Sequence, residues 1–124
     1  PLRVTTFLSS VPILPARDVE TSAAWYRDVL GYDVFHTEAE YGIVGRDESW
    51  IHFWGPSRIE PPESMTMIRV GVSGIDDLYE TCSAQSIVHE NAPLTLQPWG
   101  FREFAVRDHD GNLVTFFEPQ VETP

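Results

Sequence analysis

The sequence predicts an α+β fold in which a strand, a helix and three further strands occur twice in succession. Two segments carry apolar residues at helical spacing, and each is followed by short stretches that alternate apolar and polar residues. A proline-rich stretch at residues 55–64 separates the two halves. One half alone would leave a sheet face uncovered, so the halves are expected to pair. We therefore expect one domain over residues 1–124, with modules at 1–55 and 65–124 and a linker at 56–64.

The first half contains the clearest helix signal. Its apolar residues recur at helical spacing, at Val19, Ala23, Tyr26 and Leu30. Asp18 is a suitable N-cap, and Gly31 occupies the position of a helix C-cap glycine, so the helix is expected to cover residues 19–30. Strands are expected at residues 6–14 before this helix and at 32–37, 41–45 and 50–55 after it.

The second half repeats this order with less distinct signals. A second helix is marked by Ile75, Leu78 and Cys82. The other elements expected here are strands at 65–72, 87–89, 101–107 and 113–118, a proline-containing loop at 91–100 and a turn at 108–112. A ferredoxin-like α+β sandwich shares much of this order and stays open as an alternative.

Composition and charge exclude several classes of protein. Hydrophobic residues make up 42% of the 124 residues, which is enough for a core, and no apolar run is long enough to cross a membrane. The net charge of −11 argues against nucleic acid as a partner, because nucleic-acid binding requires neutralisation of phosphates. This charge would favour a cationic partner, although acidity also serves solubility alone. The first residues suggest no secretory signal, and the single Cys82 excludes an internal disulfide, so we expect a cytoplasmic protein.

Three local patterns carry a resemblance to a known superfamily. Residues 17–31 contain Arg-Asp-x-x-x-Ser-x-x-Trp-Tyr-x-x-x-Leu-Gly, and residues 72–79 read Val-Ser-Gly-Ile-Asp-Asp-Leu-Tyr. Residues 97–112 contain Gln-Pro-Trp-Gly, then Arg-Glu-Phe-Ala-Val-Arg-Asp, then Asp-Gly-Asn. Together these patterns resemble the glyoxalase/bleomycin-resistance/dioxygenase (vicinal-oxygen-chelate) superfamily, and the third is similar to bleomycin-resistance proteins in particular. One departure is His109, where the family's turn usually carries a proline.

The resemblance implies a fold and a ligand site. Two βαβββ modules would form curled mixed sheets around a cavity, the chain would form a homodimer, and an antibiotic would bind in clefts at the dimer interface. The positions that match the aromatic residues of the family's drug cleft are Phe35, Tyr41 and Trp99. Glu38 and Glu40 lie near the first two in sequence and could meet a cationic tail of the ligand.

The resemblance also allows a test for a metal site. Metal-dependent members take His, Glu or Gln ligands from the first and last strand of each module. The matching positions here carry Val11, His52, Met67 and Thr115. Only His52 is a normal ligand, whereas a catalytic metal usually requires about three protein donors. We therefore expect no metal and no cofactor.

Strand alternation then predicts which other side chains line the cavity. Trp50, His52 and Trp54 would share one face of their strand, and Met67 and Arg69 one face of theirs. Such a surface suits a flat aromatic ligand that stacks on rings. The alternative for the tryptophans is core packing, and for His52 it is a hydrogen bond to a neighbour.

Arg69 does not fit a site for a cation. It could pair with Glu103 or another carboxylate, or the true ligand could carry an acid group. The expected ligand-binding residues are therefore Phe35, Glu38, Tyr41, Trp50, His52, Trp54, Met67, Arg69, Trp99 and Glu103.

Three functions remain open at this stage. The first is sequestration, without catalysis, of an aromatic and cationic antibiotic of the bleomycin class. The second is a metal-independent enzyme of the same superfamily acting on a small aromatic metabolite, with His52 and Glu103 as an acid–base pair. The third is a metal-dependent enzyme with displaced ligands. No nucleophile with a partnered base is evident in the sequence, and we expect neither nucleic acid nor membrane as a partner.

Overall fold

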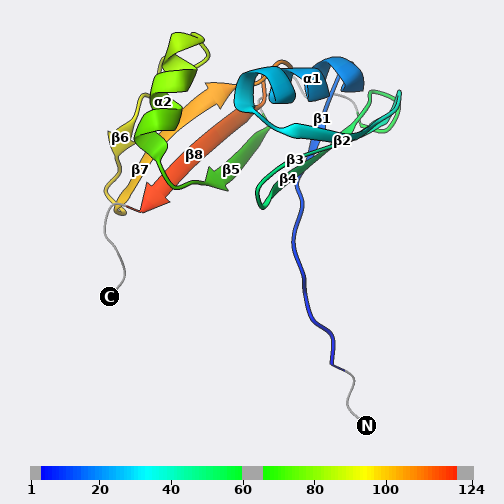
Figure 1. The fold of residues 1–124 in the computed structure, drawn as a ribbon, viewed down its shortest axis with the longest axis horizontal. Coiled ribbons are helices and arrows are strands. Elements are labelled where there is room, and N and C mark those ends of the chain that lie inside the picture. Colours follow the sequence, from blue (N-terminus) through cyan, green and yellow to red (C-terminus); the bar gives the residue numbers. More distant parts are fainter. Residues whose placement is uncertain (1–3, 60–65, 120–124) are drawn as a thin grey trace.

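The computed structural model describes residues 4–59 and 66–119 and contains two four-stranded sheets, each with one helix over it (Figure 1). The elements of the first module are β1 (Ile13–Pro15), α1 (Val19–Leu30), β2 (Asp33–Thr37), β3 (Tyr41–Arg46) and β4 (Ser49–Trp54). Those of the second are β5 (Met67–Gly71), α2 (Ile75–Ala84), β6 (Thr95–Leu96), β7 (Phe101–Arg107) and β8 (Leu113–Pro119). The predicted linker lies partly outside the described residues.

The two sheets have the same topology. Their strand orders are β1-β4-β3-β2 and β5-β8-β7-β6, so the first strand of each module lies at one edge, beside the last strand. That edge pair is parallel in both modules, and the other pairs are antiparallel. The predicted α+β class and the repeated strand–helix–three-strand order are therefore confirmed. Two separate sheets differ from the single sheet of a ferredoxin-like sandwich.

Helix α1 begins and ends at the predicted residues. The carboxylate of Asp18 accepts a hydrogen bond from the backbone N–H of Thr21 at 3.1 Å, and Gly31 ends the helix with φ at +72°. The buried face of the helix consists of Val19, Ser22, Ala23, Tyr26 and Leu30. It packs on the inner face of the first sheet, where Ile51 and Phe53 are fully buried, as strand alternation requires.

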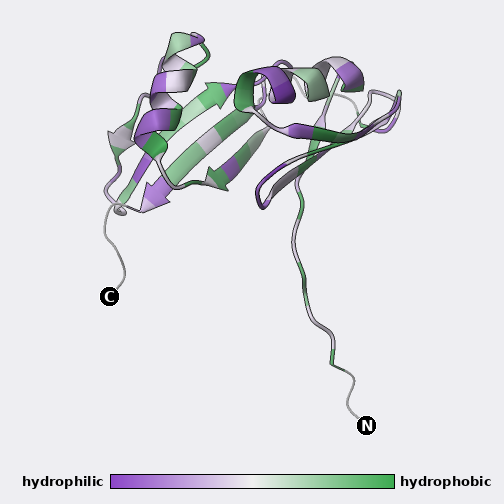
Figure 2. Ribbon diagram, in the orientation of Figure 1, coloured by the Kyte–Doolittle hydropathy of each residue, from purple (hydrophilic) through white to green (hydrophobic). Residues whose placement is uncertain are grey.

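In the second module, the helix likewise packs on the inward-facing residues of its own sheet. Phe104 and Val106 of β7 and Val114 and Phe116 of β8 are buried beneath α2. Figure 2 shows the resulting pattern, in which hydrophobic bands along these strands are interrupted by more polar ones. Each sheet therefore turns one face to its helix and leaves the opposite, outer face available for other contacts.

A buried hydrogen-bond cluster joins the two modules at the turn between β7 and β8. The hydroxyl of Tyr26 in α1 donates to Asp108 at 2.7 Å, and the side-chain amide of Asn112 donates to the same carboxylate at 2.9 Å. Ser22 and the backbone of Arg17 donate to Asp110 in the same turn. Burial raises the pKa of Asp108, although its hydrogen bonds act in the opposite direction.

Two of the predicted strands were wrong in their limits. The strand expected at 6–14 is confined to Ile13–Pro15, and residues 4–12 form an extended arm that leaves the body of the molecule (Figure 1). The strand is short because its pairing with β4 ends at Pro12, whose carbonyl oxygen accepts a hydrogen bond from the backbone N–H of His52. A strand needs a second strand to hydrogen-bond with, and local sequence does not reveal where that second strand ends.

The second error concerns the segment before β7. The strand expected at 87–89 is reduced to a single bridge between Val88 and Val106, whereas β6 lies inside the segment predicted as a loop. Prolines on both sides of β6 gave that segment the composition of a loop.

Neither helix of the described residues is long and apolar enough to span a membrane.

Candidate ligand-binding site

The outer face of the first sheet carries a pair of packed aromatic rings. Phe35 of β2 and Trp50 of β4 lie with ring centroids 4.7 Å apart, and both remain accessible, with Phe35 59% exposed. Gly45 lies opposite Trp50 in the neighbouring strand. A Cβ atom at Gly45 would come within 2.9 Å of the indole, so glycine lets the ring rest directly on the backbone.

A second aromatic group lies further along the same face. The hydroxyl of Tyr41 is 2.8 Å from Nδ1 of His52, and the two rings meet edge to face. The guanidinium group of Arg58 lies over the rings of Tyr41 and Trp54, at 5.9 and 5.7 Å from their centroids. Arg58 was missed because the proline-rich segment that contains it reads as a linker.

Two glutamates border this face and differ in availability. Glu40 accepts hydrogen bonds from the backbone N–H and the hydroxyl of Ser57, and these bonds lower the pKa of its carboxyl group. Glu38 lies 3.2 Å from Nε2 of His36, and its side chain is 54% exposed. Glu38 is therefore the carboxylate better placed to meet a positively charged group from outside.

The outer face of the second sheet is organised around Glu103. Its carboxylate receives two hydrogen bonds from the guanidinium of Arg69, at 3.2 and 2.6 Å, and one from the indole N–H of Trp99, at 2.9 Å. Arg69 in turn lies over the ring of Phe117, which stacks with Phe101. The hydrogen bonds from Arg69 first, and that from Trp99 in addition, lower the pKa of Glu103 against the opposing effect of burial.

The predicted residues therefore form two groups, one in each module. Every ring pair, hydrogen bond and cation–π contact found for them joins residues within 4–59 or residues within 66–119. Met67 lies on the same face as Arg69 and is 62% exposed. The open pairing of Arg69 is resolved in favour of Glu103, and this leaves Glu103 unavailable as a base for His52.

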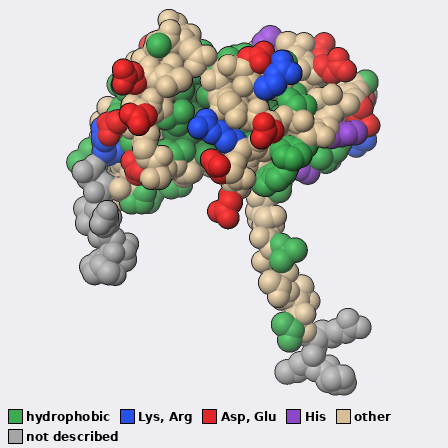
Figure 3. All heavy atoms as spheres, in the orientation of Figure 1, with side chains coloured by type: hydrophobic (Ala, Val, Ile, Leu, Met, Phe, Trp, Pro, Cys, Tyr) green, Lys and Arg blue, Asp and Glu red, His purple; other side chains and the backbone are tan. Residues whose placement is uncertain are grey.

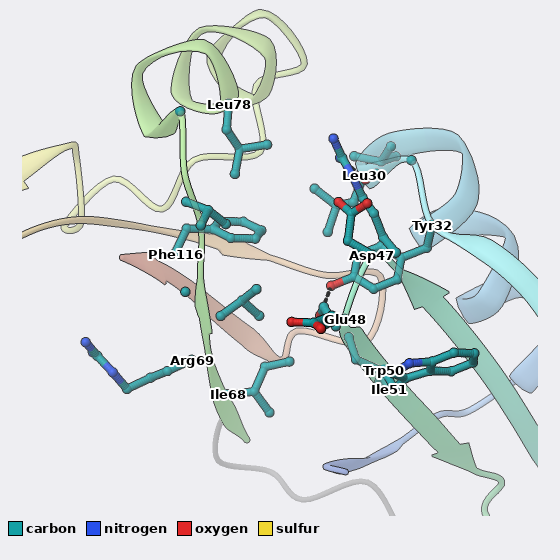
Figure 4. Close-up of a pocket in the computed structure, with 18 of the residues that line it drawn as sticks. Leu30, Tyr32, Asp47, Glu48, Trp50, Ile51, Ile68, Arg69, Leu78 and Phe116 are labelled. Carbon is teal, nitrogen blue, oxygen red and sulfur yellow. Dashed lines mark hydrogen bonds between the residues drawn. The ribbon is translucent and has the colours of Figure 1, made fainter. Parts of the chain in front are cut away.

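Between the modules lies a cleft of about 1160 Å³. Its apolar wall includes Leu30, Ile51, Ile68, Leu78 and Phe116 (Figure 4). Four acidic residues also line it, namely Asp28, Asp47, Glu48 and Asp77. Only Trp50 and Arg69 of the predicted site residues border it. Figure 4 shows the side chains of Ile68 and Arg69 on opposite sides of β5, and both residues line the cleft.

The described residues do not form a metal centre. Nowhere in residues 4–59 and 66–119 do three or more His, Cys, Asp or Glu side chains gather in a way that could hold a metal ion. The donors at the positions matched to the family's metal ligands do not fit one either, because His52 has only Ile13 of β1 and Ile43 of β3 as cross-strand neighbours.

Comparison of the sequence with known protein families identifies the family of this chain. Residues 7–116 match the model of the Glyoxalase/Bleomycin resistance protein/Dioxygenase superfamily. The chain is 34% identical to the bleomycin resistance protein of Geobacillus stearothermophilus over 127 residues, which covers 90% of this chain and 96% of that protein.

Solved structures agree with this match. The bleomycin-binding protein of bleomycin-producing Streptomyces verticillus, solved in complex with copper(II)-bleomycin, is similar with a TM-score of 0.71 and 30% identity over 91% of this chain and 97% of that one. A bleomycin resistance determinant encoded on the transposon Tn5 has the same fold, with a TM-score of 0.77 and 23% identity over 93% of this chain and all of that one. The chain described here belongs to the Glyoxalase/Bleomycin resistance protein/Dioxygenase superfamily.

Proposed function

We propose that this protein binds an antibiotic of the bleomycin class and sequesters it without catalysing a reaction. The observation that carries the proposal is the set of accessible aromatic side chains, above all Phe35 with Trp50 on the first sheet and Trp99 in the turn before β7 of the second. Exposed apolar groups held in fixed positions are typical of a binding surface. The similarity to bleomycin resistance and bleomycin-binding proteins supports this ligand class.

The charge of the protein supports a cationic ligand. The net charge of −11 would attract a cation from solution, and Glu38 offers an accessible carboxylate beside the aromatic face. A cytoplasmic location is part of the proposal, because the single Cys82 is buried and unpaired and needs no oxidising compartment.

The proposal includes a homodimer in which the module of residues 1–55 of one copy meets the module of residues 65–124 of the other, around the segment 56–64. The arm supports this arrangement, since Val4, Phe7 and Leu8 are each at least 90% exposed. Figure 3 shows hydrophobic side chains on this arm, away from the body of the molecule. Apolar side chains gain about 1.5–3 kcal/mol each when they are removed from water, so an arm of this composition favours contact with a second copy.

The dimer is tested by the mass of the protein in solution. We expect light scattering to give twice the mass of one chain for the wild type, and a lower mass for the double variant Phe7→Asp/Leu8→Asp at micromolar concentration. A wild-type protein that stays monomeric at that concentration would overturn the dimer and leave ligand binding to be judged separately.

Ligand binding is tested by following tryptophan fluorescence while metal-free bleomycin is added at low and high salt. We expect saturable quenching at about one drug per chain, weaker at high salt because salt screens the attraction between exposed charges. Trp99→Ala should weaken binding strongly. Trp25→Phe serves as the matched control, because Trp25 packs against the core. Absence of quenching at micromolar drug would refute the proposed function.

One observation favours a second candidate, a metal-independent enzyme acting on a small aromatic metabolite. Tyr41 and His52 are hydrogen-bonded on an accessible face, and such a pair can give or take a proton. Turnover of an aromatic substrate that is lost in His52→Gln, in a protein that does not bind bleomycin, would select this function instead.

A further inference from the structure

Glu103 is a buried carboxylate between two accessible side chains. Its side chain is 7% exposed, whereas that of Arg69 is 47% exposed and Trp99 is 61% exposed. The burial follows from its place in the middle of the sheet, where β7 pairs it with Thr95 of β6 on one side and with Phe117 of β8 on the other. Arg69 and Trp99 are thus accessible to solvent, whereas the carboxylate of Glu103 that binds both is not.

Both oxygens of this carboxylate are occupied. Oε1 accepts from one guanidinium nitrogen of Arg69, and Oε2 accepts from the other nitrogen and from the indole N–H of Trp99. A guanidinium bound through two nitrogens is fixed in orientation as well as in place. The indole N–H has only one hydrogen to donate, so the same carboxylate also restricts the rotation of the Trp99 ring.

The charges in this group are balanced. Arg69 carries one positive charge, Glu103 carries one negative charge, and the guanidinium rests on the ring of Phe117 at 4.8 Å from its centroid. An unpaired arginine here would repel a cationic ligand, and an unpaired buried glutamate would be costly. The pair leaves neither, so an approaching ligand meets a guanidinium and an indole with little net charge.

We propose that Glu103 is a positioning residue that holds Trp99 and Arg69 as one rigid, charge-balanced surface for the uncharged aromatic part of the ligand. The aromatic ligand is that of the proposed function, on which this part of the inference rests. A cationic part of the ligand would then be met by the first sheet, near Glu38, and not by Glu103. Rigid side chains favour affinity because less motion is lost on binding.

The positioning role is tested without any ligand. The four tryptophans give four indole N–H signals in a ¹H–¹⁵N NMR spectrum, and Trp99→Phe identifies the signal of Trp99. In Glu103→Leu, which has a similar size but no acceptor, we expect this signal to shift and its hydrogen to exchange with water faster. Glu103→Gln keeps one acceptor oxygen and should give an intermediate result, which also covers the case that the leucine variant fails to fold.

The matched control is Glu90→Gln. Glu90 also pairs with an arginine, Arg107 of β7, but its side-chain hydrogen bonds in the described part of the chain involve no tryptophan, so the signal of Trp99 should stay unchanged. If the signal of Trp99 is the same in wild type, Glu103→Leu and Glu103→Gln, the positioning role is refuted whatever the protein binds.

The charge balance is tested with metal-free bleomycin. In Glu103→Gln the positive charge of Arg69 is uncompensated, and we expect affinity at low salt to fall about tenfold, the size of one lost charged hydrogen bond. High salt should reduce this difference. The double variant Arg69→Met/Glu103→Gln has the net charge of the wild type and should recover most of the loss.

The outcomes separate the two proposals. A double variant as weak as Glu103→Gln would overturn the charge balance, while wild-type binding would still support sequestration. A wild type that does not bind bleomycin at all would refute the proposed function, and the NMR comparison would still decide whether Glu103 positions Trp99.

Discussion

The two modules share one topology but differ in how firmly their helices are held. Helix α1 buries five residues against its sheet and is tied to the other module through Tyr26 and Asp108. Helix α2 buries only Ile75 and Cys82. On the outer faces, Phe35 and Trp50 of the first module pack ring against ring, whereas Trp99 of the second is held by a hydrogen bond to Glu103. Equal topology therefore does not imply equal packing of the helices or of the aromatic side chains.

The largest expected effect compares one leucine from each helix. Leu30 of α1 is buried, so Leu30→Ala should lower the free energy of unfolding by about 3 kcal/mol through lost burial and a cavity. Leu78 of α2 is only partly buried, and Leu78→Ala should cost about 1 kcal/mol. Urea unfolding at neutral pH measures both. Equal losses would contradict the difference in packing between the modules.

A smaller effect is expected from the caps of the two helices. Asp18 caps α1 from the adjacent position, and Asp18→Ala should cost about 1 kcal/mol. The N-terminus of α2 is capped instead by Glu118 of β8, which accepts hydrogen bonds from the backbone N–H groups of Gly74 and Ile75. Glu118→Gln still accepts a hydrogen bond but loses the favourable charge at the helix end, so about 0.5 kcal/mol is expected. A larger loss of unfolding free energy for Glu118→Gln than for Asp18→Ala would contradict the expected order of the two capping contributions.

The smallest effect concerns pH and distinguishes the outer faces. Because Arg69 lowers the pKa of Glu103 in the folded protein, this pair contributes stability above the ordinary glutamate pKa of about 4.3, and the contribution is lost as pH falls through the lowered value. Glu103→Gln should therefore lose less stability than the wild type between about pH 4 and pH 3. Asp108, with its raised pKa, acts with the opposite sign in both proteins and cancels in the comparison.

The control for this prediction is an exposed ion pair. Arg107 lowers the pKa of Glu90 to about 2, but Glu90 is exposed, and solvent screens its interaction. Unfolding in urea at pH 7, 4 and 3 should give the same pH dependence for Glu90→Gln as for the wild type. Identical curves for Glu103→Gln and the wild type would show that burial of Glu103 adds nothing to its ion pair.

Prediction from sequence succeeded where the signal is local. Helix α1 was predicted from end to end because Asp18, Gly31 and the apolar spacing all lie within the helix or beside it. The inward direction of Ile51 and Phe53 followed from the alternation of a single strand. The strand at 6–14 failed because its length depends on β4, which is distant in sequence, and β6 failed because its pairing with β7 outweighs the composition of a loop.

The candidate site shows the same limit. Alternation placed Trp50, His52 and Trp54 on one face, but it could not decide whether Arg69 meets Glu103 or a ligand, because that depends on the register of β5, β8 and β7 together. Phe101, which stacks with Phe117, was not singled out, although the alternation of its strand places it on the face of Glu103. Apart from Trp50 and Arg69, the residues that line the cleft between the modules were not predicted, because the lining results from how the two sheets are placed relative to each other.

Gly45 has a consequence for engineering the proposed site. Since the indole of Trp50 rests on the backbone at Gly45, this face of the ring is closed to a ligand. The Cβ atom of an alanine at Gly45 would come within 2.9 Å of the ring and would push it away from the strand. Ligand preference could thus be altered by changing a residue that itself never touches the ligand, so Gly45 is a position at which selectivity and contact chemistry can be varied independently.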